Sequence, residues 1–323
     1  MAAAVLALVL LVAGCTIRGI RGSAITQPPT TAPPTTTTVG PTTSAAPATT
    51  TTVKPPYPVP PTGGCRGPIV EGVLAGASDP RPLVPCGQPH GTETALVLPA
   101  PLAGVAERPA ERSELADRVQ AVVATACQRG YDAYVGLPPL GTKGRVTSRL
   151  VLAWYVPTAE EWALGARWAR CDVVVLPVGG EGDTYAGSFA GVLADAQVPV
   201  ALAACGDGQG LGVRCDALHA FEAVSDGVLP AGDAPPSADA VEAARAAQCD
   251  VAAAAAIGVG SMAEQPLLVT RLLAPDRAQW ALGDRVGRCV VSAADGRQLD
   301  DSIRGIGSAP PPLASAAAPP PAG

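Results

Sequence analysis

The ten residues "WALGARWARC" (162–171) recur as "WALGDRVGRC" (280–289), with Trp, Gly, Arg and Cys at matching places. The chain has only four Trp and nine Cys in 323 residues, so chance explains the match poorly. A shared phrase at this distance indicates an internal repeat, and repeats decide the architecture of a chain. The two stretches therefore divide the protein into two halves of related structure.

Each phrase predicts a short helix that positions a Trp. A capping box precedes it, in which an N-cap side chain and the residue three positions later bond each other's backbone N–H groups. The Gly after the Trp favours a left-handed helix end. We expect both Trp to be buried core anchors, with an exposed ligand platform as the alternative. The capping pairs are Thr158 with Glu161 and Asp276 with Gln279, and the glycines are Gly165 and Gly283.

The rest of each half indicates an α+β module. Residues 113–127 and 237–249 have helical character, and we expect both helices to end at a Cys. Apolar strands follow at 149–157 and 266–275, and again at 167–177 and 284–293. We predict two tandem disulfide-bonded modules, each with a helix packed on a mainly antiparallel sheet.

The chain's two histidines occupy the same place in a repeated C-x3-H-x2-E pattern. It reads "CGQPHGTE" (86–93) and "CDALHAFE" (215–222). One His and one Glu do not make a zinc site, so we predict no metal and no cofactor. The alternative to a binding role is a buried His that holds a turn after a disulfide. The candidate binding residues here are His90, Glu93, His219 and Glu222.

Arg167 and Arg285 follow the repeated Gly by two residues. On a strand, Arg167 would share a face with Cys171, because side chains alternate. We expect both arginines to be paired near the core edge, with Glu93 and Glu222 as partners, or to contact an anionic ligand. The Gly-rich "GGEGD" (179–183) lacks the helix context of a phosphate loop and is expected to be a turn.

The eight cysteines after Cys15 form an even set, which is typical of disulfides in an exported protein. Four per half allow three pairings each. Cys205 and Cys215 flank a Gly-rich turn, while a helix packed on a sheet brings Cys249 to Cys289. By analogy, the first half pairs Cys65 with Cys86 and Cys127 with Cys171.

The N-terminus "MAAAVLALVLLVAGC" has an apolar stretch of signal-peptide length, and the small residues before Cys15 resemble a lipobox. No Lys or Arg precedes the apolar run, which departs from that pattern. We expect Cys15 to carry lipid and to anchor the protein to the outer side of the cell membrane. An ordinary cleaved signal is the alternative.

Composition sets the remaining boundaries. We divide the chain into a signal peptide (1–15), a disordered Pro/Thr-rich linker (16–62), two modules (63–198 and 199–307) and a disordered Pro/Ala-rich tail (308–323). The net charge is −6 and Lys occurs only at Lys54 and Lys143, which argues against nucleic acid as a partner.

The ordered motifs resemble the septum-formation domain of actinobacterial envelope proteins. They are a Cys, C-x-x-P-H-x-x-E, a helix with a Cys, and P-x4-W-x-x-G-x-R-x3-C, found here at Cys65, 86–93, Cys127 and 157–171. The second half repeats them, with Leu218 where the first has Pro89. The resemblance implies a role in cell division.

The sequence contains no clear catalytic centre, since each half has one His and no G-x-S-x-G occurs. We expect a non-enzymatic, lipid-anchored binding or scaffold protein of the cell envelope, acting in septum formation or wall assembly. Its partner would be an envelope protein or a cell-wall component. The alternative is a wall-modifying hydrolase.

Overall fold

The computed structural model describes residues 56–70, 72–178, 182–195, 197–207, 210–281 and 284–315. Cys15, Gly283 and most of the expected turn at 179–183 lie outside these ranges. Among the described residues, no helix combines the length and apolar character needed to cross a membrane.

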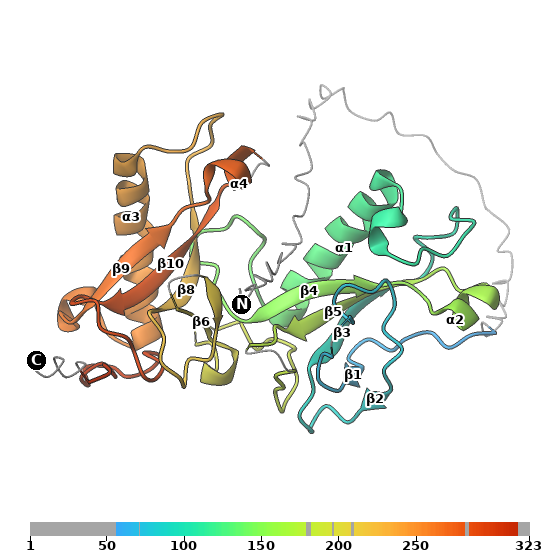
Figure 1. Ribbon diagram of the computed structural model, residues 1–323, viewed down its shortest axis with the longest axis horizontal. Helices are drawn as coiled ribbons and strands as arrows, with labels where there is room; N and C mark the ends of the chain where they lie inside the picture. The colour runs from blue at the N-terminus through green and yellow to red at the C-terminus, as the bar shows by residue number, and fades with distance from the viewer. Residues whose placement is uncertain are drawn as a thin grey trace, which may run out of the picture.

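Two five-stranded antiparallel sheets form the framework, one in each half of Figure 1. Their strand orders correspond position by position, β2-β1-β3-β5-β4 in the first and β7-β6-β8-β10-β9 in the second. The first sheet contains β1 (Cys65–Arg66), β2 (Leu83–Val84), β3 (Thr92–Leu98), β4 (Leu150–Tyr155) and β5 (Ala169–Val175). The second contains β6 (Ala204–Gly206), β7 (Leu211–Val213), β8 (Phe221–Val228), β9 (Leu268–Leu273) and β10 (Val286–Ala293).

A long helix contacts the three long strands of each sheet. Helix α1 (Asp117–Val135) contacts β3, β4 and β5, and α3 (Ala238–Ile257) contacts β8, β9 and β10. The short helices α2 (Ala159–Ala163) and α4 (Arg277–Ala281) lie in the connections between the last two strands of each half. Three 3-10 turns complete the elements, at Arg112–Glu114, Val200–Leu202 and Met262–Glu264.

Both long helices run past the cysteine at which the sequence predicts their end, so that prediction is wrong. In α1 the buried residues recur every four positions, at Val123, Cys127, Tyr131 and Val135, and this stripe keeps the helix on the sheet. Each helix stops instead at a left-handed glycine, Gly136 and Gly258.

The two sheets also share an irregularity. In the pairing of β3 with β5, the register shifts just before Leu96, which then lies opposite Cys171. In the pairing of β8 with β10, the same shift precedes Ser225, which lies opposite Cys289. Such a bulge bends a strand locally and changes the direction of its side chains. Leu96 and Ser225 therefore occupy equivalent positions in the two halves.

All four disulfides of the structure stay within one half and are the pairs that the spacing predicts. They are Cys65–Cys86, Cys127–Cys171, Cys205–Cys215 and Cys249–Cys289. In each half, the disulfide that closes the longer loop joins the long helix to β5 or β10. The disulfide that closes the shorter loop lies in the segment that leads into β3 or β8.

Within the first half, loss of Cys127–Cys171 is expected to lower the free energy of unfolding more than loss of Cys65–Cys86. The bonds close loops of 44 and 21 residues in sequence separation, worth about 4 and about 3 kcal/mol in the chain-entropy model. Guanidinium unfolding of the two double Cys→Ala variants measures both values. A larger loss for the Cys65–Cys86 variant would contradict the entropic explanation.

The segment before β4 joins the two halves through backbone hydrogen bonds to the edge of β8. The Thr147 amide donates to the Val224 carbonyl at 3.2 Å, and the Asp226 amide donates to the Arg145 carbonyl at 2.6 Å. The Arg145 side chain, which is buried, also forms ion pairs with Asp132 of α1 at 2.8 Å and Asp226 of β8 at 3.4 Å. Arg145 thus connects acidic groups from both halves.

The ordered chain extends beyond the boundary that the sequence predicts for the C-terminal tail. Leu313 forms a bridge with Leu299 and packs against the core under α3. The Ala314 amide donates to the Gln298 carbonyl at 2.9 Å. The Leu313 side chain and these backbone hydrogen bonds hold part of the Pro/Ala-rich tail on the second half.

Candidate functional site

In the first half, the predicted His and Glu meet a serine from the segment that follows β5. Glu93 is buried on β3, and its carboxylate accepts the Ser188 hydroxyl at 2.7 Å and the Phe189 amide at 2.6 Å. The Tyr134 hydroxyl of α1 donates to the same carboxylate. His90 Nε2 lies 3.6 Å from Glu93 Oε2. The carboxylate therefore holds together three separate segments.

The second half repeats this group with one change. The Glu222 carboxylate accepts the Ser302 hydroxyl at 2.9 Å and the Ile303 amide at 3.0 Å. Instead of a tyrosine, Arg304 supplies its Nε at 2.6 Å from Glu222 Oε1. Both partners of this ion pair are buried, and His219 is fully buried as well. A repeated His–Glu–Ser group is thus a built-in feature of both halves.

The backbone around each histidine explains what the group does structurally. His90 and Tyr185 exchange two backbone hydrogen bonds, each 3.0 Å long, and His219 and Leu299 exchange an equivalent pair. The imidazole Nδ1 lies 2.8 Å from the Gln88 carbonyl in the first half. The His–Glu–Ser groups therefore fasten the returning segment of each half to the entrance of its central strand.

His, Glu and Ser also occur together in hydrolases, but the geometry differs here. In a catalytic triad the serine hydroxyl contacts the histidine and stands open to substrate. Here Ser188 and Ser302 donate to the glutamates, and the histidines and glutamates are at most 2% exposed. As the side chains lie in this structure, the serines are not positioned for attack on a substrate.

The charges of His90 and Glu93 stabilise each other. Burial lowers the pKa of His90, but the nearby Glu93 carboxylate and the Gln88 carbonyl outweigh it, so the pKa lies above its ordinary 6.5. Burial raises the pKa of Glu93, but the nearby His90 and the donors Phe189, Tyr134 and Ser188 bring it below its ordinary value. The pair is therefore favoured in its ionised form.

The stability of the first half is expected to fall on both sides of a pH window set by this pair. The raised pKa of His90 stabilises the fold below about pH 6.5, and this contribution is lost as pH rises through the folded-state value. The lowered pKa of Glu93 stabilises the fold above its ordinary pKa, and that contribution is lost on acidification. Unfolding midpoints of His90→Gln measured from pH 5 to 9 should lack the decline on the alkaline side that the unmodified chain shows. An unchanged profile would contradict the pairing.

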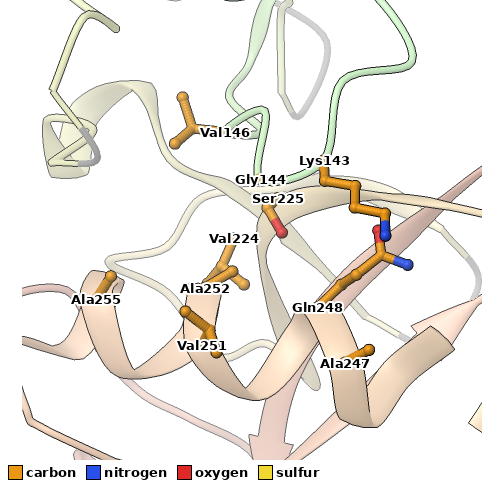
Figure 2. Close-up of a pocket in the computed structure, with 10 residues that line it drawn as sticks. All are labelled: Lys143, Gly144, Val146, Val224, Ser225, Ala247, Gln248, Val251, Ala252 and Ala255. Carbon is orange, nitrogen blue, oxygen red and sulfur yellow. The ribbon is translucent and has the colours of Figure 1, made fainter. Parts of the chain in front are cut away.

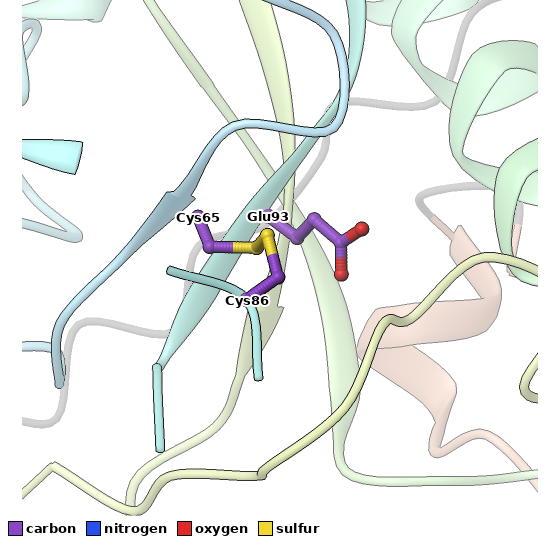
Figure 3. Close-up of side chains that lie close together, drawn as sticks. All are labelled: Cys65, Cys86 and Glu93. Carbon is purple, nitrogen blue, oxygen red and sulfur yellow. A yellow bond between two sulfur atoms is a disulfide. The ribbon is translucent and has the colours of Figure 1, made fainter. Parts of the chain in front are cut away.

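Two groups of potential metal ligands lie close together in the described residues. They are Cys65, Cys86 and Glu93 in the first half and Cys205, Cys215 and Glu222 in the second. Figure 3 shows the Cys65–Cys86 disulfide beside the stem of Glu93, with the carboxylate beyond it. Sulfur atoms bonded to each other offer no thiolate, which is the form of cysteine that binds a metal. These groups are disulfides packed on a carboxylate side chain.

Comparison with known proteins places the chain in a family. The family model described as "Septum formation" matches residues 75–289 in one continuous stretch, which is about two-thirds of the sequence. The chain belongs to the septum-formation family. No curated protein and no solved structure matches it. The single match spans parts of both halves, from before β2 to the middle of β10.

In this member of the septum-formation family, the repeated Trp and Arg stack on each other. Trp162 and Trp280 are buried, as predicted, and the guanidinium carbons of Arg167 and Arg285 each lie 3.9 Å from the ring centroid. Both capping boxes are present, and Gly165 is left-handed with φ +94°.

The predicted pairing of these arginines with Glu93 and Glu222 is wrong. Arg167 donates to the carbonyls of Trp162 and Ala166, and Arg285 donates to the carbonyls of Trp280 and Gly232 among others. Each arginine precedes its strand rather than lying on it, so its side chain turns back over the helix. The Trp–Arg pair secures the turn between helix and strand and leaves the carboxylates to other donors.

A group of buried charges, not predicted from the sequence, lies on the face of the first sheet opposite α1. Arg170 and Asp172 of β5 form an ion pair at 2.9 Å, and Asp79 pairs with both Arg170 and Arg81. Burial raises the pKa of Asp172, whereas the Arg81 and Arg170 guanidiniums hold the pKa of Asp79 below its usual value despite burial. The single Asp in "CDVVVLP" (171–177) was the available signal, because a charge within an apolar strand requires a partner.

Proposed function

We propose that this protein is a lipid-anchored, extracytoplasmic component of the cell envelope that binds or positions other envelope molecules during septum formation, without catalysing a reaction. The observation that carries the proposal is the burial of the histidine and the glutamate in both His–Glu–Ser groups. Each glutamate is committed to donors that close the fold, as Ser188 and Phe189 do for Glu93. Residue types that would suggest hydrolysis thus have a structural task.

The extracytoplasmic location is supported by the four disulfides. Disulfides form and persist in oxidising compartments outside the cytoplasm. Cys65–Cys86 and Cys205–Cys215 close the loops that precede His90 and His219. The oxidised state of these cysteines is therefore part of the fold around both His–Glu–Ser groups.

We also propose that the two halves are tandem copies of one module. The equal strand order, the bulges before Leu96 and Ser225 and the paired disulfides support a duplication. The partner of such a scaffold would be an envelope protein or a cell-wall component. The Pro/Thr-rich linker would hold the two modules away from the membrane.

Replacement of Cys15 tests the anchor. Cys15→Ser is expected to move the protein from the membrane fraction to the soluble fraction, or to stop its processing. The substitution removes the residue that would carry the acyl chains, and stable attachment needs more than one membrane-binding signal. Fractionation and immunoblotting measure the shift. Thr16→Ser, at the neighbouring position, is the control and should stay with the membrane. Normal processing together with unchanged membrane association in Cys15→Ser would rule the lipid anchor out.

The role itself is tested in cells. A fluorescent fusion is expected to concentrate at division sites, and depletion should give elongated cells with few septa. Even distribution of the fusion and normal division after depletion would contradict a septal role.

The alternative function, a wall-modifying hydrolase, is tested on isolated cell wall. The purified chain should release no soluble wall fragments beyond a buffer control. Release that is lost in Glu93→Gln or Glu222→Gln, while the variants remain folded, would instead establish the hydrolase.

A further inference from the structure

A cavity of about 310 Å³ lies where the two halves meet, between α3 and the segment that precedes β4. Figure 2 shows the side chains that line it. It is an open groove rather than an enclosed space, because Val146 and the buried Val224 face a row of α3 residues one turn apart that are exposed, with Val251 at 71%. That row is Ala247, Val251 and Ala255. Eight residues of helix span about 12 Å, so the apolar wall is elongated.

Comparison with the first half shows why this space exists. There Leu96 occupies the position of Ser225 and packs directly on Gly130 of α1, so closely that a Cβ at Gly130 would lie 2.8 Å from the leucine Cδ2. Gly130 and Ala252 both stand three residues after the helix cysteine. Where the first half fills the site with a leucine, the second places a serine and leaves room.

The serine hydroxyl is the unusual feature of the cavity. Ser225 is 1% exposed, and among the described residues its Oγ has no hydrogen-bond partner. A buried hydroxyl without a partner is costly, and it ordinarily finds a protein group, a water or a ligand. The nearby Gln248 amide is already engaged, because it pairs with both backbone groups of Val228 at 2.9 and 3.0 Å. The Ser225 hydroxyl is therefore unpaired and buried beneath the wall of this groove, and a ligand oxygen would have to enter that wall to accept from it.

The cavity has one charged residue, and it lies at the rim. Lys143 is exposed, and Figure 2 shows its amine above Gln248 at one end of the cavity. No carboxylate is among the lining residues. An elongated apolar wall, one buried hydroxyl and one cation at the edge form the usual composition of a small-molecule site, at the lower end of the size range.

We propose that this cavity binds an aliphatic chain with an anionic headgroup. The chain would lie along α3 against Val251, the hydroxyl of Ser225 would donate to an oxygen of the ligand, and Lys143 would attract the negative charge. The shared chemistry fits a fatty acid and a single-chain phospholipid alike. This site is separate from the His–Glu–Ser groups, and its test does not depend on a role in the septum.

Binding is measured with decanoate and decyl phosphate as probes, titrated into the full chain in detergent-free buffer by calorimetry and by amide chemical shifts. We expect saturable binding of one or both, with shifts centred on Val251 and Ala252. The stronger of the two identifies carboxylate or phosphate as the headgroup. Decyltrimethylammonium, with the same chain and the opposite charge, should bind at least about threefold more weakly, as expected from a surface charge contact.

Variants test the geometry. Ser225→Leu copies the first half and should reduce decanoate binding at least about tenfold by filling the space. Ser225→Ala keeps the volume, removes the hydroxyl and should weaken binding about fivefold. Ser308→Leu places the same leucine at an exposed serine and should change nothing. Decanoate binding unchanged in Ser225→Leu, or a cavity that holds only water and binds neither probe, would overturn the proposal.

Discussion

Replacing Arg304 with alanine is expected to lower the free energy of unfolding by about 3–5 kcal/mol, because it leaves the fully buried Glu222 carboxylate without its cation. Arg304 also donates to the Ala223 carbonyl at 2.9 Å, so a backbone acceptor loses its partner as well. Glu222 would retain only the Ser302 and Ile303 donors. Denaturant unfolding followed by circular dichroism measures the loss.

Arg297→Ala is the matched control, since Arg297 pairs with the exposed Asp295. Surface ion pairs of this kind change stability little. A second variant, Glu222→Gln with Arg304→Met, removes both charges of the buried pair and should recover part of the stability lost in Arg304→Ala. If Arg304→Ala unfolds at the same denaturant concentration as the Arg297→Ala control, the buried pair is not a stabilising element.

The second large effect is expected from Trp280. Trp280→Ala should cost about 3–5 kcal/mol, because the indole is 1% exposed and its removal opens a cavity in the second core. It also removes the surface over which Arg285 lies and the hydrogen bond from the indole nitrogen to the Gly232 carbonyl at 3.1 Å. Chemical unfolding with tryptophan fluorescence from the remaining indoles reports the change.

Trp162→Ala should have a comparable effect on the first half, where the same ring–guanidinium contact occurs. Leu164→Ala is the control within that phrase, because Leu164 is 52% exposed and should be nearly neutral. Equal stability of Trp280→Ala and the unmodified chain would show that the repeated phrase does not anchor the core.

Local chemistry made the repeated phrase predictable. The capping side chain, the residue three positions on and the buried Trp form a pattern that depends on a few neighbouring residues. The disulfides were predictable for a related reason, since a short Gly-rich loop and a helix on a sheet each leave a cysteine one partner within reach. Thr158 with Glu161, Cys205 with Cys215 and the burial of Trp280 follow from this.

The partners of the candidate residues could not be predicted, because they come from distant parts of the chain. Glu93 meets Ser188 from a segment 95 residues away, and Glu222 meets Arg304, whose counterpart in the first half is a tyrosine on α1. The helix ends differ from the prediction because Cys127 and Cys249 each continue a buried stripe. The cavity at Ser225 required knowing that Leu96 is its structural equivalent, which only the strand register reveals.

The Cys65–Cys86 disulfide also determines how the molecule responds to a pull on its N-terminal end. Tension that arrives at Cys65 crosses the sulfur–sulfur bond to Cys86 and reaches β3 without loading the residues between them. About 70 Å of contour length between the two cysteines therefore cannot be extended while the bond is intact, at about 3.5 Å per residue. An oxidised molecule is a short tether and a reduced one is a longer tether, so the redox state sets how far the protein can be stretched.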